Sequence, residues 1–328
     1  MSQPMIPVTE VPLVFDCEGS ALIGMAHVPE TVRARGVVFV VAGGSQYRGG
    51  MCRMQAQMAR RWAALGIPVM RFDHRGLGDS EGTFVGFTGI EADLGAAIEA
   101  FVQQVPGMTG VVLWGGCDAA SAALINAWKF PQVTGIVLGN PWVHSENTAD
   151  RAEMLHFGQR LRDKRFWLKV VRGQYNPLPA LGTVLRSLAA RLKKSPVAAG
   201  RPSADAPRDD PALPALERMR TGLSRFKGDV LLLMSGRSLV TKEFDLLVAA
   251  EPDWQQALRA PRRISRHDVL DGDQAFSTIA EREEVGEVTA RWMLDPNADL
   301  GAKPKANASA GTATDPAADP SAGEPAHA

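Results

Sequence analysis

The chain has 328 residues, with 36 Lys and Arg against 36 Asp and Glu, and 45% of its residues are hydrophobic. That length can bury a large core, as one large α/β domain or as two smaller ones. A net charge of zero argues against a protein that binds nucleic acid over its whole surface. The three cysteines, Cys17, Cys52 and Cys117, are too few for a disulfide framework, and without a CxxC pair they do not indicate zinc. We expect no metal and no other cofactor.

A membrane-spanning segment is not expected either. No apolar run approaches the roughly 18–20 residues that are needed to span a bilayer. Residues 1–19 lack the basic stretch followed by an apolar stretch that is typical of a signal peptide. The predicted compartment is therefore the cytoplasm.

Strands and helices are predicted to alternate as far as residue 143. The apolar patterns predict two strands within 11–28, single strands at 37–41, 67–72, 111–114 and 135–138, and helices at 51–65, 89–104 and 119–129. Such alternation with short connections is typical of parallel βαβ units. Right-handed crossovers then put helices on both faces of one sheet, with the functional site at the carboxyl ends of the strands.

The alternation stops at His144. The chain continues with basic helical stretches at 154–172 and 181–194, a segment rich in Pro, Ala and Asp at 196–214, strands at 229–234 and 264–270, and helices at 242–250 and 276–294. The predicted organisation is a core of residues 8–143 and 227–295, a basic helical cap of residues 144–226, and a tail of residues 296–328. Because the tail has almost no large apolar side chains, it cannot offset its ordering entropy and is predicted to be disordered.

Five residues between the strand at 111–114 and the next helix carry the clearest motif, Gly115-Gly116-Cys117-Asp118-Ala119. A tight strand-to-helix turn strains the backbone of its central residue, and small residues two positions before and after it avoid clashes. The usual form is G-x-S-x-G, which raises a nucleophilic serine above the sheet. Here Cys117 takes that position, at a helix N-terminus that favours a thiolate. The alternative is an ordinary buried cysteine near a turn.

A site of this kind also needs donors for a developing oxyanion. The backbone N–H of Asp118 is one predicted donor, and Gly44, after the first buried parallel strand, is the other. The alternative for Gly44 and its neighbour is a simple tight turn. The segment RFDHRGLGDSEG at 71–82 is predicted to be a structural loop over the same edge, with His74 as a packing residue.

Several segments together resemble one family of the α/β-hydrolase superfamily. They are GGSQYRGG at 43–50, RFDHRGLGDSEG at 71–82, WGGCDAASAAL at 114–124, NPWV at 140–143 and SGRSLVTKEF at 235–244. Over about residues 8–295 the chain resembles the exosortase A system-associated hydrolase 1 family. The resemblance implies an α/β-hydrolase fold of about eight mostly parallel strands with helices on both faces and a helical cap. It also implies a Cys-type elbow and a setting near exosortase and exopolysaccharide genes, but no known substrate.

The chain departs from the family pattern at two expected triad positions. After the strand at 229–234 the pattern reads approximately S-G-x-D-x-T, and Ser238 stands in place of Asp. After the last strand it reads G-x-D-H-x-F, and Gln274 stands in place of His. Gln cannot usefully accept a proton near neutral pH, and Ser cannot supply the charge that stabilises an imidazolium. A cysteine depends less on a base than a serine does, but deacylation still requires one to activate water.

A base from elsewhere in the chain is one way to complete the site. His144 follows NPWV, at the carboxyl end of the strand beside the nucleophile's strand, and is the candidate relocated base. The alternative for His144 is a surface residue at the start of the cap. His267 lies inside a predicted strand and is expected to pack across strands or to face solvent.

The predicted cap carries a strong positive charge. Residues 151–228 hold 17 Lys and Arg against 6 Asp and Glu, and residues 159–172 predict an amphipathic basic helix with an aromatic edge. One interpretation is recognition of an anionic acyl substrate, such as a phosphorylated carrier, a thioester or an anionic glycan. A second is peripheral docking of 159–172 to an anionic membrane surface. The alternative is a solvated basic face over an apolar contact with the core.

Two functions are compatible with these features. The first is a hydrolase or acyltransferase that uses Cys117 on an ester or thioester of a small molecule or a carrier. The second is a catalytically degenerate family member that binds a ligand or a partner. The elbow favours the first function, whereas Ser238 and Gln274 favour the second, and a fold by itself does not decide between them.

Overall fold

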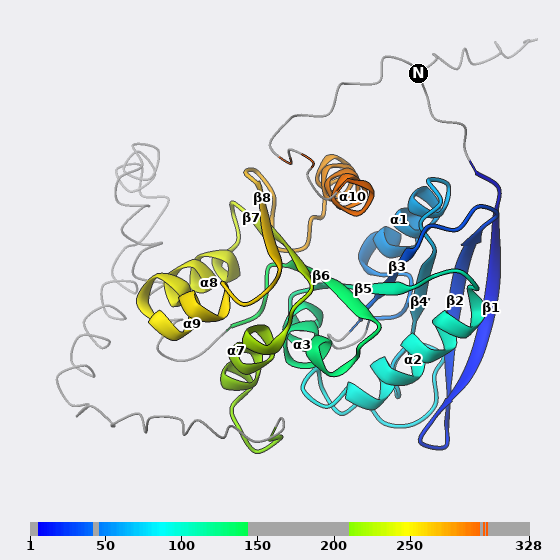
Figure 1. Cartoon of the computed structure of the whole chain (residues 1–328), viewed down its shortest axis with the longest axis horizontal. Helices are drawn as coiled ribbons and strands as arrows, with labels where there is room; N and C mark the ends of the chain where they lie inside the picture. Colours follow the sequence, from blue (N-terminus) through cyan, green and yellow to red (C-terminus); the bar gives the residue numbers. More distant parts are fainter. Residues whose placement is uncertain (1–5, 42–45, 144–209, 296–297, 299, 301–328) are drawn as a thin grey trace, which may run out of the picture.

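The structure, a computed structural model, describes residues 6–41, 46–143, 210–295, 298 and 300. Its strands form one eight-stranded sheet in the order β1-β2-β4-β3-β5-β6-β7-β8 (Figure 1). The strands are β1 Val8–Cys17, β2 Ser20–Pro29, β3 Arg35–Phe39, β4 Val69–Phe72, β5 Gly110–Gly116, β6 Val133–Gly139, β7 Asp229–Ser235 and β8 Arg263–Val269. In the described chain β2 runs antiparallel to both of its neighbours, and the remaining adjacent pairs are parallel. The predicted mostly parallel sheet is confirmed.

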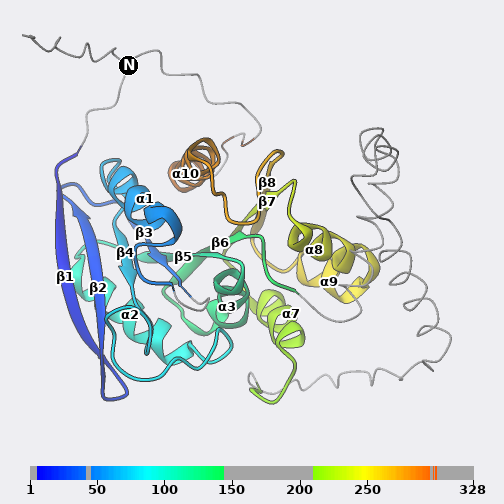
Figure 2. The same ribbon diagram turned by 180° about the vertical axis from the view of Figure 1, so that it is seen from behind.

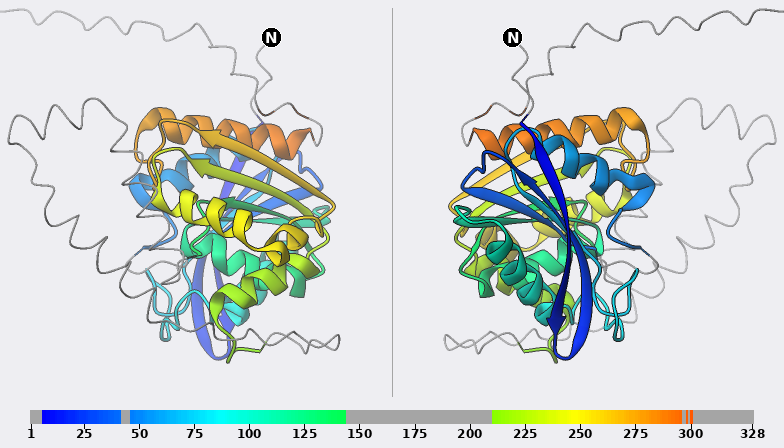
Figure 3. Two further views of the ribbon diagram at one scale, coloured as in Figure 1. Left: turned by 90° about the vertical axis from the view of Figure 1, so that its left-hand side faces the viewer. Right: turned by 90° about the vertical axis from the view of Figure 1, so that its right-hand side faces the viewer.

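Helices cover both faces of this sheet. They are α1 Met54–Ala63, α2 Glu91–Gln104, α3 Asp118–Asn126, α7 Ala215–Arg225, α8 Leu239–Ala250, α9 Pro252–Ala257 and α10 Ile279–Leu294, with single 3₁₀ turns at Met51–Arg53 and Ala127–Lys129. The core residues of α1 and α10 pack on one face, and those of the other helices pack on the opposite face. Figures 2 and 3 show α10 and α1 on one side of the sheet and α3 and α7 on the other.

The alternation of side chains along β5 explains why this strand is apolar throughout. Val111 and Leu113 pack into the core on the face of α2 and α3, whereas Val112 and Trp114 pack into the core on the face of α1 and α10. Each of the four is at most 1% exposed. A strand that is covered on both faces needs apolar residues at consecutive positions. β5 is therefore central in the sheet, as its sequence predicts.

The structure differs from the expected boundaries in three places. α9 has no counterpart among the predicted helices, because Pro252–Ala257 is short and polar. α7 falls inside the cap predicted at 144–226, but it packs on α3 so closely that a Cβ at Gly222 would lie 2.0 Å from the carbonyl oxygen of Leu124. Residues 144–209 of that cap lie outside the described residues. Leu300, in the predicted tail, is only 8% exposed and belongs to the core on the α10 face.

Candidate active site

Cys117 lies on a sharp turn between β5 and α3. Its backbone has φ 52° and ψ −118°, a strained conformation for a residue with a Cβ. Its N–H donates to the carbonyl of Gly139 over 2.7 Å, and its own carbonyl accepts from the N–H of Ser121 over 3.1 Å. A Cβ at Gly115 would meet the backbone of Ala119 at 2.5 Å, whereas a Cβ at Gly116 would meet nothing closer than 3.9 Å. The turn therefore requires glycine at 115 and tolerates a side chain at 116.

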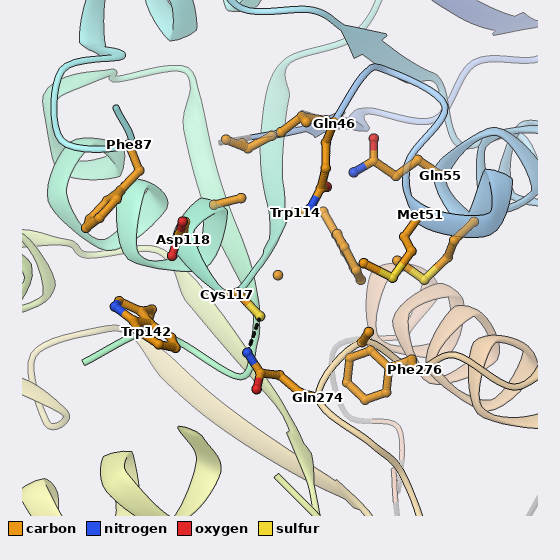
Figure 4. A pocket seen from close by; sticks show the side chains of 16 residues that line it. Gln46, Met51, Gln55, Phe87, Trp114, Cys117, Asp118, Trp142, Gln274 and Phe276 are labelled. Atoms are coloured by element: carbon orange, nitrogen blue, oxygen red, sulfur yellow. Dashed lines mark hydrogen bonds between the residues drawn. The ribbon is translucent and has the colours of Figure 1, made fainter. Parts of the chain in front are cut away.

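Gln274 reaches the sulfur of Cys117 from the loop that follows β8. Its Nε2 lies 3.4 Å from Sγ and donates a hydrogen bond to it (Figure 4). The structure thus brings together the predicted nucleophile and the residue at the expected histidine position. An amide can donate to a thiolate but cannot take a proton from a thiol near neutral pH. The contact orients the sulfur without supplying a base.

A buried polar network holds the Gln274 loop against the ends of β6 and β7. Asn140, which has φ 46°, donates from Nδ2 to the carbonyl of Gln274 over 2.9 Å and to the hydroxyl of Ser235 over 2.8 Å. Its Oδ1 accepts from the N–H of Ser235 and from the hydroxyl of Thr241, both over 2.8 Å. The Ser235 hydroxyl donates to the carbonyl of Asp273 over 2.7 Å. Sequence reasoning misses this network, although the Asn-Pro that directly follows β6 is a visible signal.

Ser238, at the other position where the sequence leads one to expect a triad residue, has a structural role. Its Oγ accepts a hydrogen bond from the N–H of Val240 over 3.2 Å and caps the N-terminus of α8. The residue is 3% exposed and, among the described residues, makes no hydrogen bond to Gln274. The two positions are therefore not joined in the way that an acid and a base of a triad are joined.

The thiol of Cys117 is not activated as the helix N-terminus suggests. Burial raises its pKa above the usual value, the hydrogen bond from Gln274 lowers it, and the neighbouring Asp118 carboxylate raises it. The net direction is upward, and Sγ accepts no capping hydrogen bond from the first N–H groups of α3. The expectation of a lowered pKa is wrong.

A cavity of about 520 Å³ opens beside Cys117. Its described lining is Val40, Val41, Gln46, Met51, Met54, Gln55, Phe87, Trp114, Gly116, Cys117, Asp118, Ala119, Trp142, Gln274, Ala275 and Phe276. Most of these side chains are apolar, which suits an acyl or aryl group. No Lys or Arg is among them, and Asp118 is the one charged side chain in this described lining. The described lining therefore offers no support for the expected anionic substrate.

The loop at 71–82 anchors the chain next to the predicted oxyanion donor. Gly44 itself lies outside the described residues, but Arg48 shortly after it is held firmly. The Arg48 guanidinium pairs with Asp73 and, over 2.7 Å, with Asp79, and its carbonyl accepts from Arg71 over 2.9 Å. The sequence predicts this loop to be structural but does not identify Arg48 as its contact.

The three described histidines lie away from the sulfur. His74 is fully buried against the Phe72 ring, and burial lowers its pKa to about 4. It is a packing residue, as predicted. His267 contacts Glu284 over 2.8 Å and the carbonyl of Leu300 over 3.0 Å, on the α10 face. His27 is buried beside Arg71. The candidate base His144 lies outside the described residues, so that proposal stays a prediction.

The described residues contain neither a membrane-spanning helix nor a cluster of side chains that could bind a metal ion. No helix in this part of the chain is long and apolar enough to cross a membrane. No group of three or more His, Cys, Asp or Glu side chains within it has an arrangement that could hold a metal ion. The predicted basic helix at 159–172 lies outside the described chain.

The sequence matches one protein-family model over most of its length. A model of the family described as "Serine aminopeptidase, S33" matches residues 32–245, which span the elbow and the strand before Ser238. No curated protein matches the sequence.

Solved structures share the fold at low sequence identity. An esterase of Pyrococcus furiosus is 13% identical, with a TM-score of 0.55 over 88% of this chain and 91% of that one. Est1E of Butyrivibrio proteoclasticus, with ferulic acid bound, is 12% identical, with a TM-score of 0.53 over 86% and 98%. A dienelactone hydrolase of Anabaena variabilis is 13% identical, with a TM-score of 0.50 over 88% and 97%. At this identity the likeness concerns the fold alone.

Proposed function

The chain belongs to the α/β-hydrolase family described as serine aminopeptidase S33, and on that premise we propose that Cys117 accepts an acyl group from a thioester or an ester. The observation that carries the proposal is the strained turn that presents Cys117 to a mostly apolar cavity of about 520 Å³. Strain of this kind is typical of a nucleophile elbow. The hydrogen bond from Gln274 to Sγ supports the same role, because it favours the thiolate over the thiol.

A thioester is the better of the two substrates for this site. The Cys117 sulfur attacks the carbonyl carbon, the bond from that carbon to the leaving sulfur breaks, and the leaving thiolate takes the proton that Cys117 loses. One thioester replaces another, so the step needs neither water nor an added proton. An ester releases an alkoxide, a much more basic leaving group, which needs a proton from a general acid as it departs. Gln274 is too weak an acid for that task.

In the second step, which removes the acyl group from Cys117, transfer to another nucleophile is favoured over hydrolysis. Water must lose a proton to attack the acyl-enzyme, and in the described lining Gln274 occupies the position where a base would accept it. A second thiol or amine is a stronger nucleophile than water at neutral pH. The proposed activity is therefore acyl transfer with slow hydrolysis as a side reaction.

Two observations favour a second candidate function. The raised pKa of Cys117 and the capping role of Ser238 are what a catalytically retired site would have. In that case the cavity binds an acyl compound without reacting with it, and the protein acts as a ligand- or partner-binding member of the family.

The direct test is acylation of the protein by the acetyl thioester of N-acetylcysteamine, followed by mass spectrometry. We expect one acetyl group on the peptide that contains Cys117. The matched controls are Cys117→Ala, which should take up none there, and Cys52→Ala, which should react like the unaltered protein. If the folded protein binds the thioester but Cys117 stays unacylated, the binding function replaces the enzymatic one.

A second test restores the family residues. Ser238→Asp with Gln274→His should raise the turnover of short p-nitrophenyl esters by at least about tenfold, since a positioned general base contributes about 10²–10⁴-fold. Asp is also a preferred N-cap residue, so the change at 238 should preserve α8. No gain in a folded double variant, combined with loss of activity in His144→Ala, would mean that the base has moved to the cap. If neither change matters and Cys117→Ala keeps the background rate, the enzymatic proposal fails.

The setting of the reaction is proposed from the sequence. The link to exosortase and exopolysaccharide systems is supported by the motifs quoted above. A carrier-linked acyl substrate and peripheral membrane contact both depend on the basic segment at 159–172, which lies outside the described residues. These remain predictions.

A further inference from the structure

Asp118 places an unpaired carboxylate in the cavity beside Cys117. Its side chain is half-buried and lines the cavity, and within the described chain it has no hydrogen bond or ion pair. Burial raises its pKa, which means that the protein does not compensate for the loss of water around this charge. A carboxylate that is partly withdrawn from water is ordinarily stabilised by a cation or a hydrogen-bond donor, and among the described residues Asp118 has neither.

Two aromatic rings lie on the same side of the cavity as this carboxylate. Phe87 comes from the loop between β4 and α2, and Trp142 follows β6; both line the cavity. Figure 4 shows Phe87, Asp118 and Trp142 together on one side of Cys117, with Met51, Trp114 and Phe276 on the other. Aromatic rings attract cations through their faces, and a carboxylate with aromatic neighbours is a common recognition site for ammonium groups.

We propose that this side of the cavity, bounded by Asp118, Phe87 and Trp142, binds an ammonium group of the substrate. The inference rests on the proposed function and narrows its substrate class. The apolar side takes the acyl chain, Cys117 meets the carbonyl between the two sides, and the cationic group belongs to the leaving group or to the acyl acceptor. The many Lys and Arg residues of the predicted cap, taken alone, favour an anionic substrate. The described lining of the cavity, whose charged side chain is Asp118, instead favours a cationic group.

A purely structural role for Asp118 does not account for its position. A carboxylate in the first turn of a helix stabilises that helix through the macrodipole. Asp118 is the first residue of α3, but its side chain does not cap the helix, and the N-cap residue is Cys117. An exposed carboxylate in the same turn would serve the helix as well without the penalty of burial.

The test compares two soluble probes of nearly equal shape. Choline carries a quaternary ammonium, and 3,3-dimethylbutan-1-ol replaces that group with a neutral tert-butyl group. Titration of the Cys117→Ala variant by calorimetry, at constant ionic strength, measures binding without any reaction at the sulfur. We expect choline to bind at least about tenfold more tightly than the alcohol, which is the size of one partly desolvated cation contact.

Two charge variants then identify the group responsible. In the Cys117→Ala background, Asp118→Asn should bring the two affinities to within about twofold of each other. Asp271→Asn is the matched control, because it removes an exposed carboxylate on the same edge of the sheet that does not line the cavity. Equal binding of both probes, no binding of choline by folded protein, or a preference that survives Asp118→Asn overturns the inference.

The outcome is independent of the acylation test. The acetyl thioester of N-acetylcysteamine carries no ammonium group, so its reaction with Cys117 reports the nucleophile alone. Acylation without a choline preference refutes the ammonium site and leaves the enzymatic proposal standing. A choline preference without acylation supports the ammonium site in a binding protein.

Discussion

The amide nitrogen Nε2 of Gln274 lies 3.4 Å from the Sγ of Cys117, at the position where the sequence leads one to expect a histidine. The amide can stabilise a negative sulfur but cannot remove its proton. This pairing therefore separates two tasks that one histidine performs in a complete triad. The sulfur is oriented and its thiolate is favoured, while the proton must leave by another route.

Loss of this contact should make Cys117 less reactive. Gln274→Leu removes the hydrogen bond that lowers the pKa of the thiol, so burial and Asp118 raise that pKa further. We expect iodoacetamide to label Cys117 at least about twofold more slowly at pH 8, because only the thiolate reacts. Gln46→Leu is the matched control, since Gln46 also lines the cavity but, within the described chain, makes no hydrogen bond to Sγ. Equal labelling rates in the unaltered protein and the Gln274 variant would contradict this.

The three cysteines should react with a thiol label in an order set by the exposure of each sulfur and by the pKa of its thiol. Cys52 is exposed, Cys117 is half-buried with a raised pKa, and Cys17 is 4% exposed with a pKa that burial also raises. The sequence alone predicts Cys117 to be the most reactive, because Cys17 lies in a strand-turn region and Cys52 opens a predicted helix without an elbow. The structure instead predicts that Cys52 labels first and Cys17 last at pH 7. Peptide mass spectrometry of samples taken during the reaction measures this order, and labelling of Cys117 ahead of Cys52 would favour the expectation from the sequence.

Replacement of Gly115 by alanine should destabilise the protein more than the same replacement at Gly116. Gly115→Ala forces a Cβ against the backbone of Ala119, and backbone cannot move aside cheaply. We expect the free energy of unfolding to fall by about 1–3 kcal/mol, the usual cost of overpacking. Gly116→Ala, one residue along the same turn, places its Cβ at an ordinary contact distance of 3.9 Å from the carbonyl oxygen of Gly139 and should cost less than about 1 kcal/mol. Urea unfolding of both variants gives the comparison, and equal losses would show that steric contact at Gly115 is not what restricts the turn.

Two buried histidines should make the fold sensitive to acid. Burial lowers the pKa of both His74 and His27 to about 4, below the ordinary value of 6.5. The unfolded chain binds these protons below about pH 6.5, whereas the folded chain binds them only near pH 4, so stability is greatest above pH 6.5 and falls as the pH drops. Each histidine should contribute a loss of about 2 kcal/mol between pH 7 and pH 5.

The variant His74→Leu isolates one of these contributions. It replaces an imidazole whose ring nitrogens have no hydrogen-bond partner in the described chain with an apolar side chain of similar size. Urea unfolding at both pH values should show a loss of stability about 2 kcal/mol smaller than in the unaltered protein. Carboxylates contribute to the pH dependence of both proteins and cancel in the difference. An unchanged loss would mean that His74 is protonated in the folded state at pH 5.

The sequence predicts the sheet well because most of its strands are marked by a run of apolar residues within the strand itself. Runs of apolar residues mark β5 and β7, and their near-complete burial on both faces explains why those runs are unbroken. The register of Cys117 between β5 and α3 follows from the same alternation. The sequence predicts no helix at 215–225 and assigns α7 to the cap, because the strand pattern resumes only at 229, while the contact of α7 through Gly222 with α3 leaves little trace in the sequence.

The chemistry of the site is harder to predict because it depends on distant contacts. The pKa of Cys117 is governed by burial and by Gln274, both products of tertiary structure, and the helix N-terminus alone predicts the wrong direction. The network around Asn140 joins residues that are about a hundred positions apart in the chain, as in its bond to Ser235. The sequence indicates a role for the backbone N–H of Asp118, and the surroundings of its side chain become visible only with Phe87 and Trp142 in place.

The pairing of β6 with β7 has a consequence for how the protein folds. The two strands are parallel neighbours, the sixth and seventh in the order of the sheet, yet residues 140–228 separate them in the chain. The entropy of closing such a loop grows only logarithmically, so doubling its length costs only about 0.6 kcal/mol. The search for the correct partner strand, however, slows as contacts become more distant in sequence. Changes in the length of this connection that leave Asn140 and α7 intact should therefore alter the refolding rate far more than the equilibrium stability.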